Sequence, residues 1–167
     1  AYPVSDEVGK SQTGAGKVFN FKVTSSINDT IDIPYTVTAR KKTVDNSLDD
    51  EAVRIYLTEV SGTAEKQLLL DNYHALDDYK NAPNGYTEKI LYNGLVSTGS
   101  TNYEKNFRLR MWIDNDIKFS PLEDGTYPYN DKEFTINVNV YANAKVVTET
   151  EVDMANTTKI ENIIVND

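Results

Sequence analysis

Apolar and polar residues alternate one by one along much of the chain. In residues 17–24, Phe19, Phe21 and Val23 fall on one side and Asn20 and Lys22 on the other. Because successive side chains of a strand point to opposite faces, this period of two predicts β-strands with one buried face. Alternation of the same kind runs through residues 30–38, 51–60, 103–114, 134–142 and 146–152.

Three further segments complete the pattern. Residues 66–72 are a short apolar run, and residues 87–96 read as a strand, although Asn93-Gly94 would also suit a tight hairpin. Residues 158–165 end the chain as a last strand or a short helix. About seven to nine strands separated by turn residues predict an all-β fold, an antiparallel β-sandwich of the jelly-roll or immunoglobulin-like kind with minor helix.

The domain organisation follows from these segments. Residues 1–16 are polar and rich in Gly and Ser without a period, which predicts a flexible N-terminal arm. Residues 17–147 form the β-sandwich domain, and residues 148–167 are a C-terminal extension that can add a strand.

The strand after the arm is a candidate for self-assembly. Its residues Val18, Phe19, Phe21 and Val23 can pair with an exposed sheet edge of another copy. The alternative is that this strand and the C-terminal extension complete their own sheets. The sequence leaves both open.

Composition narrows the class of protein. The 167 residues include 26 acidic and 17 basic side chains, a net charge of −9, which disfavours nucleic acid as a partner. No segment approaches the roughly 20 apolar residues that span a bilayer. The chain has no cysteine and starts Ala-Tyr-Pro, which fits a mature secreted protein whose leader was removed, or a trimmed sequence.

Catalytic chemistry is poorly represented. His74 is the only histidine, in a loop, so neither a zinc site with several His or Cys ligands nor a histidine-based catalytic triad is expected. We expect a protein without enzymatic activity. An enzyme is still conceivable in one form, a glycosidase that uses a pair of carboxylates, because that reaction needs only two acids at a set separation. This interpretation ranks behind the structural and binding roles described below.

Acidic residues after the strand 103–114 suggest a different ligand. Asp114, Asp116, Glu123 and Asp124 lie in or beside one loop, and calcium takes six to eight oxygen ligands that loops of β-sandwiches often supply. These four residues are the candidate metal ligands and calcium the possible cofactor. The alternative is that they are solvated loop acids.

The same strand carries the only tryptophan on its polar side. Arg108, Arg110 and Trp112 share that face, opposite Phe107 and Leu109. The face is a candidate binding surface, for a glycan or for another subunit. The other interpretation is that a second layer or a terminal segment buries it.

Three stretches, "VRIYLTEVSG", "NFRLRMWIDND" and "FTINVNVYANAKV", resemble in succession the TasA/camelysin group of secreted β-sandwich matrix proteins of Gram-positive bacteria. The resemblance covers roughly residues 17–147. It implies a jelly-roll-like sandwich and extracellular fibres in which a terminal strand passes to a neighbour. Camelysin has been described as a metalloprotease, but this chain lacks a His-Glu-x-x-His motif, so that activity is not carried over.

The expected function is therefore a secreted, non-enzymatic structural protein of the cell surface or biofilm matrix that assembles with copies of itself. The rival is an adhesion module that binds a glycan or a host or cell-surface protein with loops at one end of the sandwich.

Overall fold

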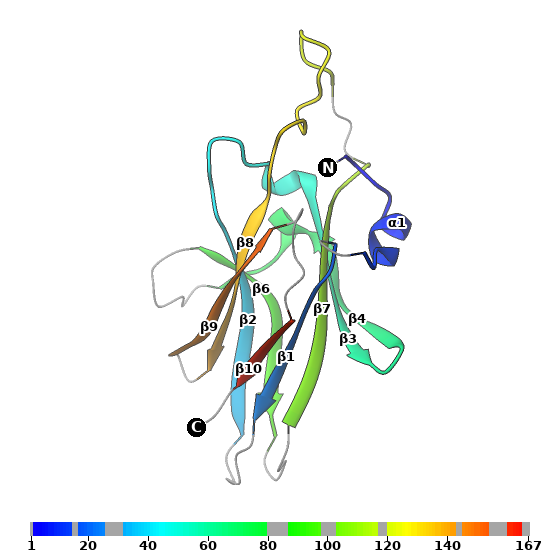
Figure 1. Cartoon of the computed structure of the whole chain (residues 1–167). Helices are drawn as coiled ribbons and strands as arrows, with labels where there is room; N and C mark the ends of the chain where they lie inside the picture. The colour runs from blue at the N-terminus through cyan, green and yellow to red at the C-terminus, as the bar shows by residue number, and fades with distance from the viewer. Residues whose placement is uncertain are drawn as a thin grey trace.

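The computed structural model describes residues 2–14, 17–25, 32–79, 87–97, 103–116, 120–142, 145–153 and 160–164. Over these ranges the chain forms two five-stranded sheets that pack face to face, with one short helix outside them (Figure 1). The prediction of an all-β sandwich with minor helix is confirmed. No helix in the described ranges is long and apolar enough to cross a membrane.

We call the sheet with strand order β10-β1-β7-β3-β4 the A sheet, and the sheet with order β5-β6-β2-β8-β9 the B sheet. The elements are α1 (Asp6–Ser11), β1 (Phe19–Ser25), β2 (Ile33–Lys41), η1 (Asp50–Ala52), β3 (Val53–Ser61), β4 (Ala64–Asn72), η2 (Tyr73–Ala75), β5 (Asp78–Tyr79), β6 (Glu88–Val96), β7 (Tyr103–Ile113), β8 (Thr135–Ala142), β9 (Lys145–Asp153) and β10 (Ile160–Ile164).

The core lies between the sheets and is built from the alternating apolar positions. Phe19, Phe21 and Phe107 are buried, and their rings stack in sequence across β1 and β7. The hydroxyls of Tyr35 and Tyr103, 2.7 Å apart, link β2 of the B sheet to β7 of the A sheet. Burial raises the pKa of Tyr35, so this link stays neutral and intact over the ordinary pH range.

Among the ten strands of the described ranges, every pairing is antiparallel except that of β1 with β10. β1 pairs antiparallel with β7 on one side and parallel with β10 on the other, from Asn20↔Ile160 to Thr24↔Ile164. The chain therefore crosses from β9 at the edge of the B sheet to β10 at the edge of the A sheet (Figure 1). The segment 158–165, which the sequence left open, is a strand over Ile160–Ile164.

The N-terminal segment differs from the predicted flexible arm. Residues 6–11 form helix α1, whose N-cap Ser5 accepts a hydrogen bond from the backbone N–H of Val8. Ahead of the helix, the backbone N–H of Val4 donates to the carbonyl of Ile113 at 3.0 Å, so the segment runs beside the end of β7. Ala1, Ala15 and Gly16 of the predicted arm, and residues 154–159 and 165–167 of the predicted extension, lie outside the described residues.

The hairpin alternative at Asn93-Gly94 is wrong. β6 runs through both residues, and the position opposite Tyr35 of β2 is Gly94. A Cβ at Gly94 would overlap the Tyr35 ring, so glycine is there to admit that ring and not to make a turn.

Candidate functional site

Helix α1 covers the face of β7 that carries Trp112. The indole N–H donates to Asp6 Oδ1 at 3.1 Å, and Arg54 of β3 donates to both oxygens of the same carboxylate at 3.2 and 2.9 Å. The hydrogen bonds from Arg54 hold the pKa of Asp6 below its ordinary value, and the indole N–H acts in the same direction. One acidic side chain of α1 thus joins two strands of the A sheet.

Gly9 completes the cover. It is the buried residue of α1, and a Cβ at this position would overlap the indole ring of Trp112. Only 3% of Trp112 is exposed. The interpretation that a terminal segment buries this face is confirmed at Trp112, and an open binding surface at this residue is wrong, because the helix backbone lies directly on the ring.

Arg110 is held in the same way. Its guanidinium donates to Glu65 Oε1 at 2.8 Å and Oε2 at 3.3 Å, and its Nε donates to the carbonyl of Gln12 at 2.7 Å. The side chain is 1% exposed. The hydrogen bonds from Arg110 hold the pKa of Glu65 below its ordinary value. Because Arg110 also donates to Gln12, this partly buried pair anchors the segment after α1. We call α1, Gln12 and the side chains they cover the N-terminal clamp.

Arg108 lies just beyond the clamp and is partly buried. Its Nε donates to Asn20 Oδ1 at 2.8 Å, and its Nη1 lies 3.4 Å from Glu65. It lines a shallow groove of about 490 Å³ on the outer face of β1 and β7, together with Lys22 and Asn106. Arg108 and Arg110 also line a smaller hollow of about 150 Å³ beside Thr13 and Val18. The guanidinium groups of both arginines already have protein partners, and Trp112 lines neither of these two pockets.

The candidate self-assembly residues are part of the protein's own core. Phe19, Phe21 and Val23 are at most 2% exposed, and Val18 is partly buried just ahead of β1. Because β1 lies between β7 and β10, it is an interior strand of its own sheet. In the folded chain this strand therefore completes its own sheet, which was the alternative to pairing with another copy.

The four candidate metal ligands are not gathered into one site. Asp114 Oδ1 accepts the backbone N–H of Asp116, and Asp124 Oδ1 accepts both the N–H and the hydroxyl of Thr126. The bonds from Thr126 lower the pKa of Asp124. In the described part of the chain, no group of three or more His, Asp or Glu side chains is placed to hold a metal ion. Residues 117–119 of this loop lie outside the described ranges.

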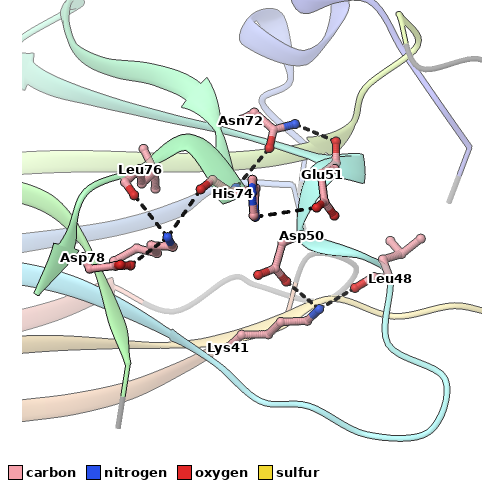
Figure 2. Close-up of polar contacts among 9 residues, drawn as sticks. Lys41, Leu48, Asp50, Glu51, Asn72, His74, Leu76 and Asp78 are labelled. Carbon is pink, nitrogen blue, oxygen red and sulfur yellow. Dashed lines mark hydrogen bonds and ion pairs between the residues drawn. The ribbon is translucent and has the colours of Figure 1, made fainter.

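Two lysines fix the loops at this end of the sandwich. Figure 2 shows Lys41 directed at the carbonyl of Leu48 and the carboxylate of Asp50, at 2.6 and 2.7 Å. Lys89 of β6 donates to the carbonyl of Leu76 at 3.1 Å and to Asp78 at 2.8 Å. These charge-assisted hydrogen bonds to protein oxygens order the two loops: Lys41 holds the loop around η1, and Lys89 holds the loop around η2.

His74 belongs to η2 and its side chain is directed at Glu51 of η1 (Figure 2). Its Nδ1 is 3.6 Å from Glu51 Oε1, and both side chains are more than half exposed (Figure 2). The carbonyl of Glu51 also accepts the side-chain amide of Asn72 at 2.6 Å. The only histidine thus belongs to a surface network that ties η1 to η2.

The B sheet contains a buried carboxylate that the alternation pattern does not predict. Glu88 is fully buried and accepts hydrogen bonds from Thr38 at 2.6 Å, Asn139 at 2.7 Å and Tyr141 at 2.7 Å. All three donors are neutral, and the Tyr79 ring stacks on Tyr141 with centroids 5.2 Å apart. Alternation assigns these residues to the solvent side of β2, β6 and β8, so the pattern alone hides the cluster.

Comparison of the chain with family models, curated proteins and solved structures finds no match.

Proposed function

We propose that this protein is a non-enzymatic structural subunit of the cell surface or extracellular matrix, and that copies join by exchange of the C-terminal strand β10. The resemblance to the TasA/camelysin group supports the extracellular role. The observation that carries the proposal is the parallel pairing of β10 with β1 at the edge of an otherwise antiparallel sheet.

A strand in this position is suited to exchange. β10 is five residues long, follows a crossover from the other sheet, and lies at the end of the A sheet order. An added strand is held by main-chain hydrogen bonds, and these form equally well whether the strand comes from the same chain or from another copy. A strand passed to the next copy gives a head-to-tail contact, which repeats into a filament when the rotation does not close.

The structure favours β1 as the acceptor and not as the donor. Removal of β1 would expose Phe19, Phe21 and Val23 and would split β7 from β10. Removal of β10 leaves β1 paired with β7 along its whole length. The strand that can leave at the lower cost is therefore the C-terminal one.

The test is binding of β10 in trans. A chain that ends at residue 159 is mixed with a labelled synthetic peptide of residues 160–167, and binding is followed by fluorescence anisotropy. The matched control peptide carries Ile163→Pro, which removes a backbone donor from the middle of the strand. Far-UV circular dichroism and Trp112 fluorescence report whether the truncated chain is folded.

Saturable binding of the native peptide, with weaker binding of the proline peptide, is the expected result. A folded truncated chain that binds neither peptide would contradict strand exchange. If the truncated chain does not fold, Ile163→Pro in the full chain replaces it: the proposal then requires this variant to lose assembly that the parent chain shows.

A further inference from the structure

We propose that a second site, at the loop end of the sandwich, binds a saccharide built from neutral or amino-bearing hexose units. The site is a pocket of about 400 Å³ between residues 47–52 and residues 122–132, which we call the loop-end pocket. It is separate from the N-terminal clamp and from β10, so it does not depend on the strand-exchange proposal.

The walls of the loop-end pocket are joined by backbone pairing. The N–H of Leu48 donates to the carbonyl of Glu133 at 2.7 Å, and the N–H of Glu133 donates to the carbonyl of Asn46 at 3.0 Å. The side-chain amide of Asn46 reaches the carbonyl of Asp131 at 3.3 Å. With Lys41 holding Leu48 and Asp50 from below (Figure 2), the pocket is formed before any ligand arrives.

The second wall of the pocket, residues 122–132, carries exposed apolar side chains. Leu122 is 52% and Tyr127 is 40% exposed, and Pro128 lies beside them. The rings of Tyr127 and Tyr129 stack with an interplanar angle of 10° and centroids 5.3 Å apart. An exposed, supported aromatic ring of this kind offers a flat face to the C–H side of a sugar ring.

Polar side chains from both walls line the pocket. Asp49 precedes η1 but its side chain makes no capping hydrogen bond there. Asn130 uses its Oδ1 to accept the backbone N–H of Tyr127, and Asp131 lines the pocket with a positive φ of 55°. Carboxylates accept and amides both donate and accept, which matches the hydroxyl groups of a hexose.

Charge narrows the class of saccharide. The lining includes Asp49, Asp124 and Asp131 against Lys132, and the whole chain carries a net charge of −9. An acidic sugar would be repelled, whereas an ammonium group on an amino sugar would be attracted to both the carboxylates and the tyrosine face. We therefore expect glucosamine units to bind more tightly than their N-acetylated forms.

The experiment uses the full chain, labelled with ¹⁵N, and three soluble probes. These are the β-1,4-linked tetramers of glucosamine and of N-acetylglucosamine, and tetragalacturonic acid as the acidic probe. Amide shifts are followed during titration. The variants are Tyr127→Ala and Asp49→Asn, and the control is Leu95→Ala, which removes another exposed apolar side chain, one of β6.

The proposal predicts saturable shifts in residues 46–49 and 122–133 with the glucosamine tetramer, weaker shifts with the N-acetyl tetramer and none with the acidic probe. Tyr127→Ala is expected to weaken binding at least tenfold, and Leu95→Ala to leave it unchanged. No saturable shift with either amino-sugar tetramer would overturn the proposal. So would saturation of the same residues by an oligolysine peptide when neither tetramer binds.

Discussion

At Gly9 the backbone of α1 lies directly against the Trp112 ring of the A sheet. Alanine usually stabilises a helix relative to glycine, but a Cβ here would overlap the Trp112 ring. We predict that Gly9→Ala lowers the free energy of unfolding by about 1–3 kcal/mol, the usual cost of overpacking. Urea denaturation followed by Trp112 fluorescence measures it.

The control for Gly9 lies one residue away. Val8 is on the same helix and is 50% exposed, so Val8→Ala is expected to change stability little. Equal stabilities of Gly9→Ala and the parent chain would show that α1 does not rest on Trp112.

Glu88 is a fully buried carboxylate that lies outside the hydrophobic core. Glu88→Ala would remove the acceptor of the buried Thr38 hydroxyl and of the Asn139 amide. Since each buried donor that loses its partner costs about 1–3 kcal/mol, we predict a loss of about 3 kcal/mol or more in urea denaturation.

The comparison for this variant is Thr36→Ala. Thr36 also donates a side-chain hydrogen bond, to Asn93, but that bond is exposed. Its loss is expected to change the free energy of unfolding by less than about 1 kcal/mol. Similar losses for both variants would mean that the burial of Glu88 has no energetic consequence.

At the scale of elements, the N-terminal clamp is expected to respond to acid. The pKa of Asp6 lies below its ordinary value of 3.8, and that of Glu65 below 4.5. A lowered pKa in the folded state gives stability that is complete above the unfolded value and is lost as the pH falls through the folded value. We predict that Trp112 emission shifts to the red below about pH 4.

Asp6→Asn and Glu65→Gln test this assignment. Both variants remove the carboxylate, so the double variant is expected to have a weaker clamp at neutral pH and a flatter acid titration of Trp112 emission. An acid transition of the double variant that coincides with that of the parent chain would assign the pH response to other groups.

The strands could be predicted from the sequence and the clamp could not. Phe19, Phe21 and Val23 repeat with a period of two in the sequence. The burial of β1 follows the same period, because each of these apolar side chains enters the shared core. Helix α1 has six residues, too few for a helical period, and its stability depends on Trp112 and Arg54, which are distant in sequence.

The same limit applies to the candidate sites. Arg110 and Trp112 stand on the polar side of β7, and no local pattern shows that residues 6–12 cover them. Asp114 and Asp124 lie in or beside one loop, but each carboxylate bonds within its own turn. Periodicity identifies which residues share a face of a strand. It does not show which segment packs on that face, because that segment is distant in the sequence.

At the scale of the whole molecule, the three features lie at different places in one sandwich. The clamp covers the face of β7 that carries Trp112, β10 lies at the edge of the A sheet, and the loop-end pocket is formed by residues 47–52 and 122–132. A subunit arranged in this way can offer its loops to a ligand while its terminal strand joins the next copy. This combination suits a matrix protein that both polymerises and binds polysaccharide.

The most direct test of the central claim is size-exclusion chromatography with light scattering, on the full chain and on the chain ending at residue 159, over a range of protein concentrations. Negative-stain microscopy then examines any large species. The account predicts that the full chain forms assemblies of several lengths that grow with concentration, and that the shortened chain stays monomeric. A monomer at every concentration for the full chain, or equal assembly of both chains, would contradict it.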